Sequence, residues 1–307
     1  MGALVTLAWI AAAVAGAAAV GWAFRAAAVA LAPREAAKVL RTAPLAASFG
    51  MVVILVYVVV AALAPLIAPY PENAVVGARY LPWSAEHWLG TDNLGRDMFS
   101  RLVYGARNTV GIAFATTALA FFAGAALGLL AAAVGGWLDQ VLGRIVDVLM
   151  AIPALIFALL LLTIFGASIV NMVLVIALID STRVFRLARA VAMDIVVMDY
   201  VEAARLRGER LPRLIGREIL PNAAAPLVAE FGLRFCFVFL AISALSFLGL
   251  GIQPPTADWG SMVRDNAALI TFGDVTPLLP AGAIALLTVA VNFVVDWMLY
   301  RSSGLKE

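Results

Sequence analysis

Residues 199–222 read DYVEAARLRGERLPRLIGREILPN, an arginine-rich stretch between two long apolar segments of the chain. Gly208 divides it into two short helical patterns, because glycine can adopt a positive φ and turn the chain at little cost. The apolar side chains that can project from it are Leu206, Leu211, Leu214 and Ile215. The arginines around them are Arg205, Arg210, Arg213 and Arg217. A simple connection needs no such order, so the stretch predicts a rigid, knobbed surface that transmits force to a soluble partner.

The composition identifies lipid as part of the solvent of this protein. Of the 307 residues, 64% are hydrophobic and 13% are charged, and the mean hydropathy is +1.02. An average soluble domain is about 45–50% apolar and about 25% charged, so this chain has too few polar residues to cover a water-exposed surface. The net charge of +2 is small and scattered, which predicts no nucleic-acid partner.

Seven apolar segments are long enough to cross a bilayer as helices, since about 20 apolar residues span the hydrocarbon layer. They are residues 4–31, 46–68, 106–134, 145–165, 169–188, 227–250 and 279–300. The first segment has no Lys or Arg ahead of it, unlike a secretory signal peptide. It predicts an uncleaved extra helix with its N-terminus outside, and the alternative is a helix that lies peripheral to the others.

The basic residues predict the orientation, because cytoplasmic loops carry an excess of Lys and Arg. With residues 33–44 in the cytoplasm, the same side receives Arg144, Arg301, Lys306 and the arginines between 183 and 217. The opposite side receives Arg79, Arg96, Arg101, Arg107 and Arg264. The loop 189–226 and the C-terminus are therefore predicted to be cytoplasmic, and the loops 69–105 and 251–278 to face outward.

The scarcity of reactive side chains excludes several kinds of chemistry. Cys236 is the only cysteine and His87 the only histidine, so no internal disulfide and no Cys/His metal cluster can form. His87 lies beside Trp88 in a polar segment, which favours a loop histidine at the membrane surface over a catalytic base. Neither lysine, Lys38 or Lys306, belongs to a phosphate-binding G-x-x-x-x-G-K-[ST] loop. No cofactor is expected in this chain, and any ATP that drives it must be bound by another chain.

The 199–222 stretch resembles the EAA loop of ABC importer permeases, in which E-A-A is followed by three residues, a glycine, a spacer and I-L-P. The residues that fill these places are Glu202, Ala203, Ala204, Gly208, Ile219, Leu220 and Pro221. The resemblance implies coupling helices that dock into a cleft on an ATPase subunit. Glu218 departs from the histidine often found before I-L-P, which changes the local charge. A basic amphipathic loop lying on anionic lipid is the alternative.

Two motifs in the loops predicted to face outward narrow the resemblance to dipeptide, oligopeptide and nickel permeases. Residues 87–97, HWLGTDNLGRD, are similar to H-x-L-G-T-D-x-x-G-R-D through Gly90, Thr91, Asp92, Gly95, Arg96 and Asp97. Residues 246–260 resemble S-F-L-G-L-G-x-Q-P-P…W-G through Gly249, Gly251, Gln253, Pro254, Pro255, Trp259 and Gly260. Asp92, Arg96 and Asp97 predict an ion-paired turn. A structural role at the outer mouth and a contact with a binding protein both remain open for these motifs.

The three motifs follow the family's order, and the resemblance covers roughly residues 34–300. It implies an all-α integral membrane protein with the six-helix transmembrane core of a type I ABC importer plus one extra N-terminal helix. The expected divisions are 1–32, the extra helix; 33–45, a basic cytoplasmic segment; and 46–307, the transmembrane domain that contains the coupling loop 189–226.

The resemblance also implies a function and partners in the bacterial cytoplasmic (inner) membrane. The chain would form half of the translocation pathway of an ATP-driven importer and would not itself be an enzyme. Its expected partners are a second homologous permease, two ABC ATPase subunits that hold ATP and Mg, an extracytoplasmic substrate-binding protein and membrane lipid. Dipeptides or oligopeptides are the expected cargo, although relatives with these motifs also carry nickel complexes and other small solutes. An ion-coupled transporter would need midplane carboxylates in two matching repeats, which the sequence lacks.

Charged, polar and small residues inside the predicted spans indicate ion pairs, pore-facing positions and close helix packing. Asp180 precedes Arg183 by three residues and Glu230 precedes Arg234 by four, spacings at which opposite charges pair on a helix. Pairing near the cytoplasmic face is predicted, and a role in the substrate path is the alternative. The candidate pore-facing polar residues are Thr163, Asn171, Ser243, Ser246 and Asn292. The sequence G-x-x-x-G at 124–128 predicts close helix packing within the bundle.

Overall fold

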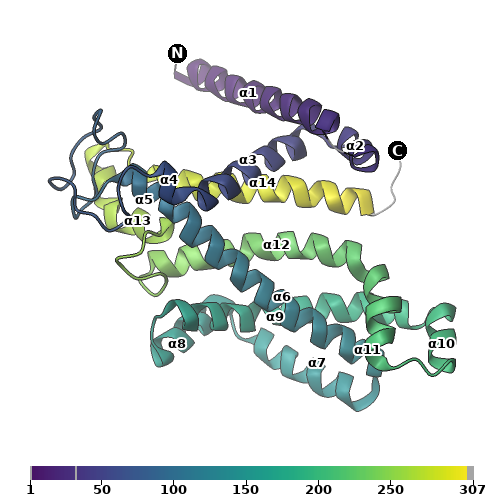
Figure 1. Cartoon of the computed structure of the whole chain (residues 1–307). Coiled ribbons are helices and arrows are strands. Elements are labelled where there is room, and N and C mark those ends of the chain that lie inside the picture. Colours follow the sequence, from purple (N-terminus) through teal and green to yellow (C-terminus); the bar gives the residue numbers. More distant parts are fainter. Residues whose placement is uncertain (1, 32, 303–307) are drawn as a thin grey trace.

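The protein is a bundle of long helices in a computed structural model that describes residues 2–31 and 33–302 (Figure 1). The α-helices are α1 (Gly2–Leu31), α2 (Arg34–Arg41), α3 (Leu45–Ala62), α4 (Ala64–Ile67), α5 (Met98–Gly105), α6 (Gly111–Val134), α7 (Gly136–Ala151), α8 (Ala154–Phe165), α9 (Ile169–Val196), α10 (Asp199–Leu206), α11 (Leu211–Arg213), α12 (Leu220–Phe247), α13 (Trp259–Asn266) and α14 (Leu278–Ser302). Two π-helical turns, η1 (Ala106–Val110) and η2 (Leu214–Ile219), and a 3₁₀ turn, η3 (Ala267–Phe272), extend them. The predicted all-α class is confirmed, while the predicted cytoplasmic C-terminus with Lys306 lies outside the described residues.

Four helical stretches are long and apolar enough to cross a membrane. They are Leu45–Ala62, Met98–Val134, Leu211–Phe247 and Leu278–Arg301. Helix formation keeps their backbone N–H and C=O groups bonded within each segment, which hydrocarbon surroundings require. These stretches contain most of four predicted spans, and the second begins at Met98 rather than at 106. The predicted spans 4–31 and 169–188 are also helical, as α1 and α9, and their crossing of the membrane stays a prediction.

The predicted span 145–165 is wrong as one continuous helix. α7 and α8 meet at Ile152 and Pro153 with a bend of 88°. A proline clashes with a helical conformation at the residue before it, and Ile152 is accordingly extended, with φ −87° and ψ 129°. The pair is a broken span or a re-entrant segment, and α8 packs against α9.

The close packing of α6 on α9 depends on two glycines. A Cβ atom at Gly124 would lie 2.4 Å from the carbonyl oxygen of Ser181, and one at Gly128 would lie 2.6 Å from that of Phe185. Only residues without side chains let two backbones approach this closely. The G-x-x-x-G pattern therefore serves packing within this chain, as the sequence predicted.

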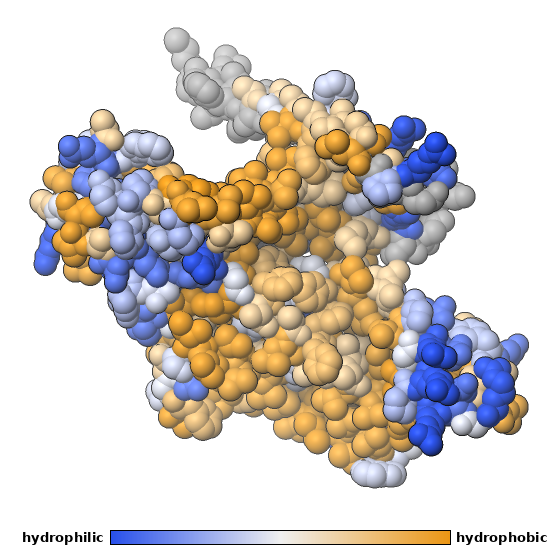
Figure 2. Space-filling model, in the orientation of Figure 1, coloured by the Kyte–Doolittle hydropathy of each residue, from blue (hydrophilic) through white to orange (hydrophobic). Residues whose placement is uncertain are grey.

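The molecule has two hydrophilic ends separated by a hydrophobic middle (Figure 2). In Figure 1 the segment between α4 and α5 lies at one end with α13, and α10, α11 and α2 lie at the other. The main apolar core centres on Trp259, Phe239 and Ile242. A second cluster joins α6 and α9 to Val201, Leu214 and other residues at the α10 end. The packed helices therefore link the two hydrophilic ends, so that a movement at one end can be transmitted to the other.

Candidate functional site

The EAA loop, here residues 199–221, contains a tight turn that ends α10. Gly208 has φ +77°, in the left-handed region that favours glycine. Its N–H donates to the carbonyl of Arg205 (2.9 Å), and the N–H of Glu209 donates to that of Ala204 (3.2 Å). This pair of bonds is the Schellman arrangement that satisfies the last carbonyls of a helix. The predicted division into two short helices at Gly208 is therefore present.

One face of the EAA loop is anchored to the rest of the molecule. Val201, Ala204, Leu214 and Ile219 are buried, and they pack in the same cluster as residues of α6 and α9. The Arg205 guanidinium donates to the carbonyl of Ala133 at the end of α6, at 2.8 Å. A displacement of the loop therefore moves α6 and α9 with it, because packed interiors deform little.

The other face of the loop is exposed. Leu206 is 84% exposed, and Glu202, Ala203, Leu220 and Pro221 are exposed as well. Of the four apolar side chains predicted to project, Leu206 is exposed, whereas Leu211 and Ile215 are half-buried against the second apolar cluster. Leu214 is wrong as a knob, since it is only 3% exposed and belongs to the core. Sequence spacing could not predict which of Leu206 and Leu214 is exposed. The turn at Gly208 and the π-helical turn η2 lie between or at these residues and change the direction of each side chain.

The 87–97 motif folds into a turn built on buried polar groups. Arg96 Nε lies 2.7 Å from Asp92 Oδ2, and Arg101 Nε lies 3.4 Å from the same oxygen. Asp97 caps α5 by accepting from the Ser100 N–H (2.8 Å). Its other oxygen contacts Nδ1 of His87 at 3.1 Å. The ion-paired turn is thus present, with Asp97 serving as helix cap and histidine partner.

The remaining positions of this motif hold the turn together. Thr91 Oγ1 donates to the carbonyl of Ala78 (2.7 Å) and accepts from the N–H of Leu81 (2.8 Å). Gly90 and Gly95 have positive φ and approach the backbone at Leu81 and Gly77. His87 lies in the loop between α4 and α5, as the sequence predicted, and its side chain is buried within that loop. Its ring faces Asp97, and its backbone N–H donates to Ser84 Oγ at 3.0 Å, so both groups of His87 help to hold the turn.

The 246–260 motif forms a second turn after α12. The Ile252 N–H donates to Ser246 Oγ (3.1 Å), and Gln253 Nε2 donates to the carbonyls of Gly249 and Gly251, both at 3.0 Å. The Pro254–Pro255 peptide bond is cis. Gly260 packs directly against the carbonyl of Ser243. These contacts fix the path of the chain from α12 into α13.

Asp258 and Trp259 link this turn to α5 and η1. Asp258 caps α13 through the Ser261 N–H (2.8 Å) and accepts from Thr109 Oγ1 (3.0 Å). Burial raises the pKa of its carboxyl above the ordinary value for aspartate, and these hydrogen bonds oppose the rise. Trp259 is buried and donates through Nε1 to the carbonyl of Leu102 at 2.9 Å. The two motifs therefore form one motif cluster, defined here as residues 87–109 and 246–261.

Sequence reasoning missed the residues that join the two halves of the motif cluster. A Glu72 carboxylate oxygen accepts from Asn108 Nδ2 (2.9 Å) and from the Ala257 N–H (2.7 Å). Arg101 donates to the carbonyl of Glu72 at 2.8 Å. The polar Asn108 and Thr109 at the start of a long apolar run were the only sequence feature that could have revealed these contacts.

The charges inside α9 and α12 form one cluster. Arg183 lies 3.2 Å from Asp180, and Arg234 lies 2.7 Å from Glu230, so both predicted pairs are present. Arg234 also reaches Asp180 at 3.5 Å, a contact between helices that spacing alone does not reveal. Ser243 and Asn292 bond to carbonyls of their own helices, and whether they face the pore stays a prediction.

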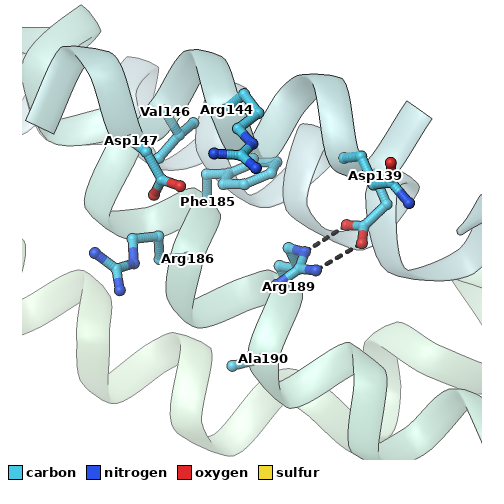
Figure 3. Close-up of a pocket in the computed structure, with 10 residues that line it drawn as sticks. Asp139, Arg144, Val146, Asp147, Phe185, Arg186, Arg189 and Ala190 are labelled. Atoms are coloured by element: carbon cyan, nitrogen blue, oxygen red, sulfur yellow. Dashed lines mark hydrogen bonds and ion pairs between the residues drawn. The ribbon is translucent and has the colours of Figure 1, made fainter. Parts of the chain in front are cut away.

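A polar cavity of about 490 Å³ opens between α7 and α9 (Figure 3). Arg189 makes a two-pronged ion pair with Asp139, and the second bond, from Nη2, is 2.6 Å long. Arg144, Asp147 and Arg186 lie around the same opening (Figure 3). The Asp139 pair ties the start of α7 to α9. Within residues 2–31 and 33–302, no group of three or more His, Cys, Asp or Glu side chains is placed to hold a metal ion.

Comparison with known proteins identifies relatives of this chain. Residues 124–303 match the family described as binding-protein-dependent transport system inner membrane component. Residues 34–82 match the N-terminal transmembrane domain of oligopeptide transport permease C. Both matches leave out α1.

Individual relatives agree with these family matches. The dipeptide transport system permease protein DppC of Alkalihalophilus pseudofirmus is 35% identical over 86% of each chain. The di/tripeptide transport system permease protein DppC of Pseudomonas aeruginosa is 36% identical over 80% of this chain and 84% of its own. The probable D,D-dipeptide transport system permease protein DdpC of Escherichia coli is 33% identical over 84% and 86%. The chain therefore belongs to the family of inner membrane permease components of binding-protein-dependent transport systems.

Proposed function

We propose that this chain forms half of the translocation pathway of an ATP-driven importer of dipeptides or oligopeptides. The relatives named for peptide transport support the cargo class. The observation that carries the coupling role is the two-sided EAA loop: Leu206 is exposed on one side, while Val201 and Leu214 anchor the other. A surface of this kind can receive a partner and pass its motion to the membrane helices.

The partners follow from this role. A second, homologous permease completes the pathway, and two ABC ATPase subunits that bind ATP and Mg dock on Glu202, Ala203, Leu206 and their neighbours. The EAA loop and the C-terminus then lie in the cytoplasm. The motif cluster lies on the opposite side, where a substrate-binding protein delivers the cargo. The excess of arginine at the EAA end supports this orientation.

Motion in the ATPase pair would reach the pathway through the anchored face of the loop. Closure of the ATPases pushes α10, and the shared apolar cluster carries the push to α6, α9 and α12. The helices then rock between inward-open and outward-open arrangements, whose populations nucleotide binding shifts. The break between α7 and α8 gives the bundle a point at which two segments can turn relative to each other.

Leu206 provides the sharpest test, because its side chain contributes little to the fold of this chain. In the assembled complex, Leu206→Ala and Leu206→Glu are expected to lower recovery of the ATPase subunits and to reduce ATP-dependent import at least about tenfold. Leu66→Ala is the matched control, since Leu66 is 82% exposed and lies outside the EAA loop. Full ATPase recovery and full import in both Leu206 variants would rule out this docking surface.

A further inference from the structure

We propose that Arg183 binds the carboxylate of the cargo inside the membrane, in a groove between α8, α9 and α12. This inference rests on the proposed import of peptides and assigns a site to it. The groove encloses about 320 Å³ and is lined by Asp180, Arg183, Phe237, Leu240 and other residues, most of them apolar. An apolar pocket with a few converging polar groups is the usual form of a site for a small organic ligand.

The positions of Asp180 and Arg234 along their helices argue against ion pairs that serve only the membrane surface. Asp180 is 11 residues beyond Ile169, the start of α9, which places it about 16 Å along a helix with a rise of 1.5 Å per residue. Arg234 is 7 residues beyond Leu227, where the predicted span 227–250 begins, or about 10 Å along that part of α12. Charges at such depth in apolar helices are costly, and they usually mark a pathway or a ligand.

The cluster is built so that one arginine can leave its partner. Arg234 is buried between Glu230 and Asp180, at 2.7 and 3.5 Å, and its guanidinium lies 4.7 Å from the centre of the Phe237 ring. Arg183, by contrast, has a side chain that is 40% exposed, and its ion pair among the described residues is with Asp180, at 3.2 Å. If Arg183 turns toward a ligand, Asp180 keeps Arg234 as its partner. Asp180 and Glu230 then share Arg234, so each carboxylate keeps one guanidinium contact while the three groups carry a net charge of −1. A carboxylate left with no guanidinium at all would be strongly unfavourable.

The groove has the chemistry that a peptide needs. A guanidinium presents a planar fork of N–H donors that matches a carboxylate with two parallel bonds. The walls beside it, Leu155, Phe237 and Leu240, offer apolar surface for a side chain of the cargo. The groove therefore suits a small organic acid with an apolar part, and a peptide with a free C-terminus belongs to this class.

The first experiment compares import of a dipeptide with import of its C-terminal amide by the complete complex in proteoliposomes. At saturating loaded binding protein, Arg183→Gln is expected to slow import of the free acid about tenfold and to leave the slower import of the amide unchanged. Arg183→Lys is expected to restore part of the rate for the acid. The concentration of binding protein that gives half-maximal import should not change, because the variant affects a later step.

Arg186→Gln is the matched control, since Arg186 lies on α9 in the other cavity and should import both peptides normally. Equal loss for acid and amide in Arg183→Gln, or no loss for either, would overturn the proposal while leaving peptide import intact. If the unmodified complex imported neither peptide, the proposed function itself would fail.

A labelling experiment tests the site without relying on a chosen cargo. Cys236 is the only cysteine and is buried, so Cys236→Ser gives a background for single cysteines. Arg183→Cys in the assembled complex is expected to react with a charged thiol reagent in one nucleotide state, whereas Leu178→Cys, outside the groove, should not react. Absence of labelling at position 183 in every nucleotide state would show that no aqueous path reaches it and would overturn the proposal.

Discussion

The motif cluster and the EAA loop use their distinctive residues in opposite ways. In the motif cluster, Thr91, Asp92, Arg96, Asp97 and Asp258 are all buried, and their polar atoms bond to neighbouring side chains or to the backbone. In the EAA loop, buried contacts are mostly apolar, and the characteristic Glu202 and Ala203 remain exposed. A motif of the first kind maintains the fold, whereas one of the second kind keeps side chains available to a partner.

The largest effect is expected from a substitution that removes the central carboxylate of the buried charge network in the motif cluster. Asp92 is 1% exposed and has two arginines beside it, Arg96 and Arg101. Asp92→Ala leaves these guanidinium groups buried without their carboxylate, which should lower the free energy of unfolding by about 3–5 kcal/mol. Denaturant titration in mixed micelles measures this loss.

Asp194→Ala serves as the control for that experiment, because Asp194 is exposed near the end of α9. We expect it to change the free energy of unfolding by less than about 0.5 kcal/mol. A loss at Asp92 as small as that at Asp194 would mean that the network does not hold the motif cluster together.

The next largest effect on the free energy of unfolding is expected at the anchored face of the EAA loop, and little effect is expected at its exposed face. Leu214 is 3% exposed in the apolar cluster, so Leu214→Ala should lower the free energy of unfolding by about 2–5 kcal/mol. Leu206→Ala, at an exposed position, should change it by no more than about 0.5 kcal/mol while still impairing ATPase docking. The same titration, followed by ATPase recovery, distinguishes them. Comparable unfolding losses for both variants would contradict the division of the loop into an anchored and a free face.

Sequence reasoning reached the fold class, most helices and the local turns, because these depend on hydropathy and on nearby residues. Hydropathy alone could not reveal the 88° bend at Pro153, since the apolar run continues through it. It also could not distinguish Leu214 from Leu206, whose exposure depends on packing against α6 and α9. The contacts of Glu72 with Asn108 and Ala257 join positions far apart in sequence, so no local pattern predicts them.

A smaller effect concerns the turn at the end of α10. Gly208→Ala places a Cβ atom in open space but forces alanine to adopt φ near +77°, which should cost about 1–2 kcal/mol. Faster amide hydrogen exchange in residues 199–221 would report this loss of local order. Gly216→Ala is the matched control, because Gly216 also has open space around it but lies within η2. It should slow exchange or leave it unchanged, since alanine favours helix over glycine. If both variants sped exchange equally, the special backbone geometry of Gly208 would not be the cause.

The smallest effect is expected from breaking an exposed ion pair in the same loop. Arg213 lies 3.3 Å from Glu209, with side chains 58% and 27% exposed. Water screens such a pair and ordering its long side chains costs entropy, so Glu209→Gln should lower the free energy of unfolding by no more than about 0.5 kcal/mol. The loss should shrink further at high salt, because ions screen exposed charges. A loss as large as that of Asp92→Ala would show that burial is not what separates the two regions. Ion pairing in the EAA loop would then contribute to its rigidity as much as the apolar anchor does.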